Sequence, residues 1–194
     1  MTDSPTLEQR IDRIESRLAI GELPTRYARA VDGRDIDAWL ALFIEDVNCG
    51  RFGTGREALR QFIEPNLRSF YRSIHYICGH TVDFIDEDTA DGTTYCRAEH
   101  EDGDQWITMG IVYFDRYVRR GGTWYFERRR EKHWYSADEA DRPHAPFQLW
   151  DRYTDHLPEL PQAFPTWAGF WDKVSGEEIA RLTRQPVTDT KGPS

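Results

Sequence analysis

The feature that most constrains the fold is a change in hydrophobic period near Phe70. Before it, apolar residues recur every three to four positions, which is the spacing of amphipathic helices. After it, apolar and polar residues alternate in four runs, at about 72–86, 89–101, 105–119 and 123–136. Short polar turns separate these runs, and such turns join antiparallel strands. The order predicts an α+β fold, in which three N-terminal helices cap a curved antiparallel sheet and form a cone.

The three helices are expected between Leu7 and Phe70. The first ends at Asp32, and we expect a kink or break near Gly21–Pro24, because an interior proline removes a hydrogen bond and clashes with the preceding turn. Asp35 is expected to cap a short second helix. The third should begin at Thr54-Gly55-Arg56-Glu57, which has the pattern of a capping box. A cone closed by helices has an apolar interior suited to a small molecule.

From Ala137 the composition changes, because prolines recur with aromatic residues between them. Such a segment cannot be regular sheet, and it is too aromatic for a free linker. We therefore expect one domain over residues 1–136 and an irregular arm over 137–194. The arm is expected to pack over this domain or over a neighbouring subunit, with a disordered tail at its end.

Composition excludes several classes of function. The net charge of −9 argues against a general affinity for nucleic acid or for an anionic membrane surface. No apolar run approaches the ~20 residues that a membrane span needs, and the N-terminus does not resemble a signal peptide. Cys49, Cys78 and Cys96 have no CxxC spacing, and we expect them to be reduced, buried thiols of a cytoplasmic protein.

His75 is the first candidate functional residue, because it lies on the apolar face of the first strand, where an unpaired imidazole is costly. The best candidate partner is Asp32, at the end of the first helix. Alternatively, Asp32 only caps a turn and His75 is a satisfied core histidine. Strict alternation places His80 on the opposite face from His75, and no helical histidine motif is present, so no metal site is predicted.

Several stretches of the chain resemble SnoaL-like domains of the nuclear-transport-factor-two-like superfamily. They are the run from Tyr27 to Asp35, Trp39 to Phe43 with Asp46, Gly55 to Leu59, His75 with His80-Thr81-Val82, and Tyr113, Asp115 and Gly121-Gly122-Thr123-Trp124. The resemblance covers roughly residues 8–136 and implies the α+β cone of this superfamily.

The enzymes that the chain resembles belong to the branch of scytalone dehydratase, bile-acid dehydratase and lindane dehydrochlorinase. These are cofactor-free lyases with an Asp–His pair, and they are usually homotrimers. By position, the resemblance implies that His75 is the catalytic histidine and Asp32 its aspartate. It also matches Tyr27 to a tyrosine of the bile-acid enzymes and His100 to the second histidine of scytalone dehydratase.

The predicted chemistry is a dehydratase-type elimination, without a cofactor, from an apolar cyclic small molecule of polyketide, steroid or aromatic type. His75 would act first as base and then as acid, with Asp32 fixing its tautomer. Tyr27 and His100 would be polar helpers. The candidate substrate-binding residues are Trp39, Phe43, Trp106, Tyr113 and Arg130.

Arg130 is expected to share a face with Trp124 and Phe126, where it could bind an anionic group of the substrate. Alternatively, it pairs with acidic side chains of the neighbouring strands. An isomerase or cyclase could use the same Asp–His pair, and a non-catalytic small-molecule-binding or assembly protein could have the same cone. A homo-oligomer is expected, with a trimer favoured over a dimer.

Overall fold

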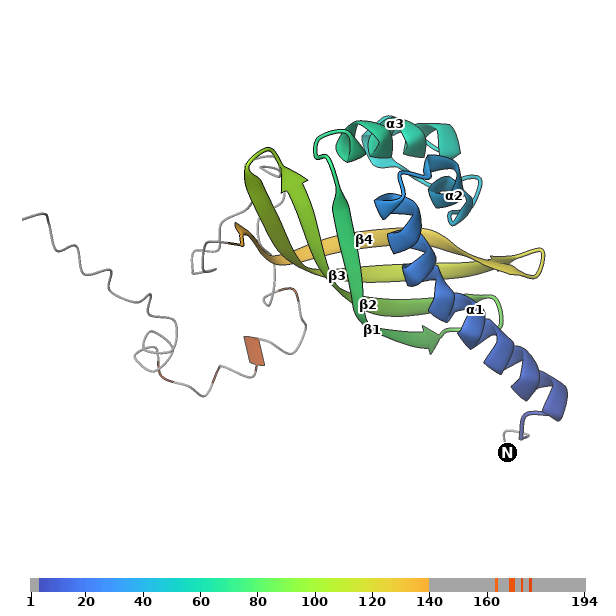
Figure 1. Cartoon of the computed structure of the whole chain (residues 1–194). Coiled ribbons are helices and arrows are strands. Elements are labelled where there is room, and N and C mark those ends of the chain that lie inside the picture. The colour runs from blue at the N-terminus through green and yellow to red at the C-terminus, as the bar shows by residue number, and fades with distance from the viewer. Residues whose placement is uncertain (1–3, 140–162, 164–167, 170–171, 173–174, 176–194) are drawn as a thin grey trace, which may run out of the picture.

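The computed structural model describes residues 4–139 together with 163, 168–169, 172 and 175. Helices α1 (Leu7–Asp32), α2 (Ile36–Ala41) and α3 (Arg56–Leu67) precede strands β1 (Ser73–Phe84), β2 (Thr89–Asp102), β3 (Gln105–Arg120) and β4 (Thr123–Asp138). The strands form one antiparallel sheet in the order β1-β2-β3-β4. Helix α1 crosses one face of this curved sheet, and α2 and α3 close one end (Figure 1). The predicted α+β fold is confirmed.

Helix α1 is a single helix that continues through Pro24, so the expected break near Gly21–Pro24 was wrong. Pro24 is fully buried, as is Ile20. Packing against the sheet therefore outweighs the local cost of the proline. Leu7, Ile11, Ile14 and Leu18 are exposed on the first half of α1, and the N-terminal end of this helix extends beyond the sheet (Figure 1).

The two predicted helix caps differ in outcome. The Asp35 side chain accepts a hydrogen bond from the Ala38 backbone N–H at 3.0 Å, which confirms the cap of α2. The prediction of a capping box at Thr54 was wrong, because the N-cap of α3 is Gly55 and no side chain caps this helix. Gly55 has φ +98°, a conformation that favours glycine, and its N–H donates to the Val47 carbonyl at 2.8 Å.

A β-bulge in β1 changes which residues face the interior. Ile77 pairs with Cys96 and Gly79 pairs with Tyr95, so Cys78 is the extra residue. A bulge of one residue reverses the alternation beyond it. His80 therefore returns to the inner face that carries His75, and the expectation of opposite faces was wrong.

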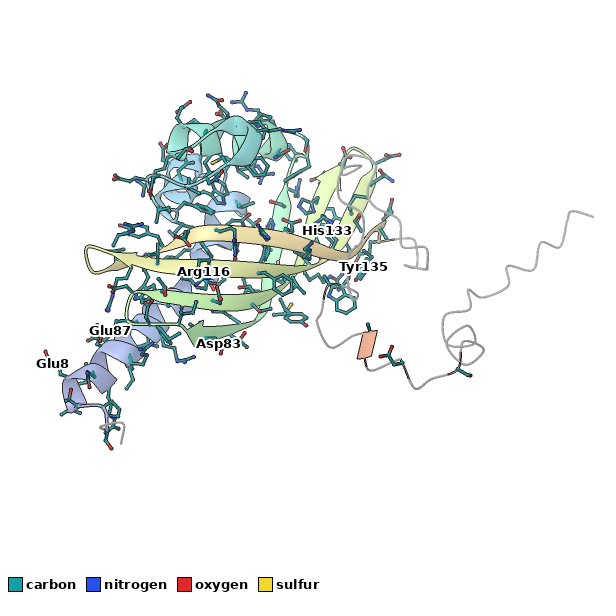
Figure 2. All side chains as sticks on the ribbon, turned by 180° about the vertical axis from the view of Figure 1, so that it is seen from behind. Glu8, Asp83, Glu87, Arg116, His133 and Tyr135 are labelled. Carbon is teal, nitrogen blue, oxygen red and sulfur yellow. The ribbon has the colours of Figure 1, made fainter. Side chains whose placement is uncertain are left out.

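A second bulge lies in β4. Arg116 pairs with Arg128 and Tyr117 pairs with Phe126, so Glu127 is the extra residue. Beyond Glu127 the inner face continues with Arg129. Arg130 therefore lies on the outer face, and the expectation that it shares a face with Phe126 was wrong. This outer face is seen in Figure 2, where Arg116 is labelled on β3.

Several further expectations concern the ends of the domain and the thiols. Strand β4 runs to Asp138, two residues beyond the predicted domain boundary, and the predicted arm lies almost wholly outside the described residues. All three cysteines are free; Cys96 is buried, whereas the bulged Cys78 is exposed, so the expectation of buried thiols was wrong there. Among the described helices, none is long and apolar enough to cross a membrane.

Candidate active site

A cavity of about 790 Å³ lies between the helices and the inner face of the sheet, which is a size typical of small-molecule sites. Apolar side chains from helices and strands form much of its wall. The polar or titratable side chains that reach it include Tyr27, His75, His100, Tyr113, Arg129 and Glu131.

Asp32 and His75 make two contacts on one wall of this cavity. Asp32 Oδ1 lies 2.7 Å from His75 Nδ1, and Asp32 Oδ2 accepts the His75 backbone N–H at 2.9 Å. Ser73 Oγ donates a third hydrogen bond to Asp32 Oδ1 at 2.9 Å. Burial acts to raise the pKa of Asp32, but the hydrogen bonds from His75 and Ser73 outweigh it and the pKa is lowered. The carboxylate is therefore ionised at neutral pH.

Arg34 holds the end of α1 against the start of β1. It has the left-handed backbone φ of 56°, rare for a residue other than glycine. Its Nη1 donates to Ser73 Oγ at 2.9 Å and to the Val31 carbonyl at 2.8 Å, and its Nη2 donates to the Tyr71 carbonyl at 3.2 Å. Asp32 is thus positioned by tertiary contacts as well as by its own helix.

Tyr27 lies one to two turns before Asp32 on α1 and faces the same cavity. Its ring centre is 5.8 Å from those of Trp39 and Tyr113, and 6.5 Å from that of His75. Burial raises the pKa of Tyr27 above its ordinary value. The hydroxyl group therefore stays protonated at neutral pH and can donate a hydrogen bond.

His100 lies beside His75, with 5.7 Å between the ring centres and the planes nearly perpendicular. It also packs edge-on against Phe70 at 4.6 Å, and only 3% of the residue is exposed. Burial, with a smaller effect of the neighbouring His75, lowers the pKa of His100 to about 4. His100 is therefore neutral at pH 7.

Arg129 lies at the floor of the cavity in an ion pair with Asp115. Its Nε and Nη2 donate to the two carboxylate oxygens at 2.8 and 2.7 Å, and both side chains are almost fully buried. The guanidinium carbon lies 4.2–4.4 Å from the ring centres of Tyr27, Tyr113 and Phe126. Arg129 Nη1 has no hydrogen-bond partner among the described residues. This nitrogen is itself buried, so the guanidinium keeps one unpaired donor group beside the cavity.

Asp115 also anchors a polar network behind this floor. It accepts hydrogen bonds from Tyr117 Oη at 2.9 Å and from Thr94 Oγ1 at 3.2 Å. The Tyr117 hydroxyl in turn lies 3.0 Å from His80 Nε2. Burial lowers the pKa of His80. This network holds the Asp115 carboxylate, and with it the Arg129 guanidinium, in one orientation.

Glu131 and His133 form a second carboxylate–histidine pair, two residues further along the inner face of β4. Glu131 Oε1 contacts His133 Nε2. The side chain of His133 is 1% exposed, whereas that of Glu131 is 29% exposed and lines the cavity. The carboxylate is therefore the accessible member of this pair.

The structure brings most of the predicted site residues together and leaves two outside. Tyr27, Asp32, His75, His100, Trp39, Phe43 and Tyr113 lie at the cavity wall or contact it. Trp106 lies on the outer face, where its indole N–H donates to Glu99 at 3.0 Å. Arg130 lines a separate groove on that face with Arg128 and Lys132.

Three polar residues of the inner face were not predicted from the sequence: Arg129, Glu131 and His133. In a strand with three consecutive arginines at 128–130, either the middle arginine or the two outer ones must face inward. The residue types do not show which alternative holds, because the bulge at Glu127 determines the alternation beyond it. His80 moved to the inner face by the same kind of shift, yet the described residues contain no group of three side chains that could bind a metal.

Comparison with known proteins identifies the same fold. A family model described as a SnoaL-like domain matches residues 12–130. A scytalone dehydratase-like protein from Novosphingobium aromaticivorans DSM 12444 is 25% identical, with a TM-score of 0.59 over 69% of this chain and 93% of the other. No protein with a curated description matches this sequence.

Two hexachlorocyclohexane dehydrochlorinase structures are similarly close. LinA is 29% identical, with a TM-score of 0.60 over 71% of this chain and 98% of its own. The LinA-type3 enzyme from Novosphingobium barchaimii LL02 is 26% identical, with a TM-score of 0.60 over 69% of this chain and 96% of its own. Nearly the whole of each neighbour is thus matched by about 70% of this chain.

Proposed function

Because this chain belongs to the SnoaL-like domain family, we propose that it is a cofactor-independent lyase that eliminates water from a cyclic polyketide-, steroid- or aromatic-type molecule. A small-molecule lyase function agrees with the scytalone dehydratase-like and dehydrochlorinase neighbours. The observation that carries the finer proposal is the 2.7 Å contact between Asp32 Oδ1 and His75 Nδ1 at the wall of a large cavity.

His75 is the proposed base. A hydrogen bond from Nδ1–H to an ionised carboxylate fixes the tautomer and leaves Nε2 as the proton acceptor. Nε2 removes the proton from the carbon next to a carbonyl group, and Asp32 stabilises the resulting imidazolium. The same Nε2–H then protonates the leaving hydroxyl group. One C–H and one C–O bond break, a C=C bond forms, and water leaves.

Arg129 and Tyr27 are proposed to stabilise the oxygen that becomes negative during proton removal. Arg129 has an N–H donor group without a protein partner in the described part of the chain, and the Tyr27 hydroxyl is protonated. Hydrogen bonds aimed at developing charge in a dry cavity are among the largest contributions to catalysis. The neutral His100 is proposed to contact the substrate beside His75.

The proposal is tested with a panel of cyclic β-hydroxyketones of one to three rings, by following the absorbance of the conjugated enone product. The wild-type protein should convert at least one member, and His75→Ala should not, while Cys78→Ser, a change at an exposed position of the same strand, should retain conversion. Exchange of the α-proton without loss of water would support an isomerase or cyclase instead. Binding without exchange or conversion would support a non-catalytic binding protein.

A further inference from the structure

We propose that Glu131, held by His133 on the inner face of β4, accepts a hydrogen bond from a hydroxyl group of the substrate. This inference rests on the proposed function, because it concerns the same cavity. It narrows the substrate class from apolar ring compounds to ring ketones that carry a hydroxyl group at the end facing β4.

The pair is oriented so that only its carboxylate reaches the cavity. His133 lies opposite Ile111 in the sheet and is almost completely buried, and its Nε2 contacts Glu131 Oε1. Glu131 lines the cavity with its side chain partly accessible. This is the reverse of the Asp32–His75 pair, in which the imidazole lines the cavity. A carboxylate can accept several hydrogen bonds, so contact with His133 leaves room for a ligand donor.

The charge of Glu131 acts on the other polar groups of the cavity. It contributes to raising the pKa of Tyr27 and of Tyr113, and it opposes the lowering of the pKa of His100. These groups come from three different elements, so the carboxylate lies close to the space that they enclose. A partly buried carboxylate at the wall of a mainly apolar cavity favours a ligand that supplies a hydrogen-bond donor.

Arg129 supplies the complementary group on the same strand. Its Cα lies about 7 Å from that of Glu131, since residues two apart on a strand share a face. Arg129 places a guanidinium against the cavity, and Glu131 places a carboxylate beside it. A molecule with a carbonyl oxygen and a hydroxyl group a few bonds apart satisfies both. A methyl ether or a hydrogen in place of the hydroxyl removes the hydrogen bond between the ligand and this carboxylate.

The test uses three probes that cannot undergo elimination, because the carbon next to their carbonyl bears no hydrogen. They are 2,2-dimethyl-1-indanone and its 3-hydroxy and 3-methoxy derivatives. Dissociation constants are measured by calorimetry on the wild-type protein and on Glu131→Gln, Glu131→Asp and Glu127→Gln. Glu127→Gln is the matched control, since Glu127 is an exposed carboxylate at the bulge of the same strand.

The wild-type protein and Glu127→Gln should bind the hydroxy probe about tenfold more tightly than either other probe. Glu131→Gln should reduce this preference to less than about threefold and leave the affinity for 2,2-dimethyl-1-indanone within about twofold. Glu131→Asp, which keeps the charge but shortens the side chain, should lie between them. The wild-type comparison needs no variant, so it remains informative if a substitution prevents folding.

Equal affinity of the wild-type protein for all three probes, or no binding of any of them, would overturn the inference. So would a preference that Glu131→Gln retains. Failure of the lyase proposal gives a different result, namely a hydroxyl preference that depends on Glu131 in a protein that converts no β-hydroxyketone.

Discussion

Asp32 holds both the ring and the backbone of His75, through Oδ1 at 2.7 Å from Nδ1 and Oδ2 at 2.9 Å from the backbone nitrogen. Two contacts from one carboxylate fix the orientation of the imidazole as well as its tautomer. The end of α1 and the start of β1 are thereby joined at the cavity wall. The predicted contact between these residues is confirmed, and its catalytic role is what the following measurements address.

Replacing Asp32 with Asn should lower kcat on a converted β-hydroxyketone by at least about a hundredfold, with little change in KM. An amide can keep a hydrogen bond to His75, but it cannot stabilise the imidazolium. Steady-state kinetics on Asp32→Asn and on Asp35→Asn provide the comparison, because Asp35 caps α2 and does not line the cavity. A kcat for Asp32→Asn within a few-fold of the wild-type value would contradict the assignment.

The Arg129–Asp115 pair should show strong coupling in stability. Asp115→Asn leaves a buried guanidinium without its counter-charge and should cost about 3 kcal/mol in the free energy of unfolding. Arg129→Met should be similarly costly, because it leaves Asp115 without its cation. The double variant Arg129→Met/Asp115→Leu should cost clearly less than the sum of the single variants. Urea unfolding of the four proteins measures the coupling, and additive costs would count against a buried pair.

His100 should make the stability of the protein depend on pH. Its pKa is lowered to about 4 in the folded state, so the unfolded chain binds more protons between about pH 6.5 and pH 4. Stability should therefore be lost as the pH falls through this window, by about 3 kcal/mol more in the wild-type protein than in His100→Gln. Urea midpoints at pH 4, 5, 6 and 7 give the two slopes. Parallel slopes would show that His100 is not shielded from protonation.

The thiols should react at very different rates. Cys78 is exposed at the bulge, whereas Cys96 is buried and its pKa is raised to about 12, chiefly by burial. A thiol reagent should modify Cys78 of the native protein at once and Cys96 only after unfolding. Cys78→Ser should remove the fast reaction. Fast modification of Cys96 in the folded protein would contradict the placement of that residue in the core.

The layers of the fold are visible in the sequence because each has its own period. The change near Phe70 separates helices from strands, and short polar turns define the hairpins. Local propensity alone predicts a break at Pro24, but the helix continues through this residue because Pro24 is buried in the core. A sequence pattern describes one helix or strand at a time. The packing of α1 on the sheet involves two elements, so the pattern of α1 alone does not predict it.

The inner face of the sheet could be predicted only as far as its first irregularity. One extra residue at Cys78 and another at Glu127 reverse the alternation, and neither residue type distinguishes a bulge from a regular strand. His75 precedes the bulge in β1 and was placed correctly. His80, Arg129 and Arg130 follow a bulge and were not. The polar side chains that β4 contributes to the cavity were therefore the part that sequence reasoning missed.

Proton removal by His75 is the central claim, and hydrogen exchange tests it without a leaving group. The measurement is the rate at which 1-indanone exchanges the hydrogens next to its carbonyl in D₂O, followed by proton NMR. The wild-type protein and the exposed-position control Cys78→Ser should accelerate this exchange at least about a hundredfold over buffer, and His75→Gln should not exceed the buffer rate. Exchange by His75→Gln at the wild-type rate, or no acceleration by the wild-type protein, would contradict the account.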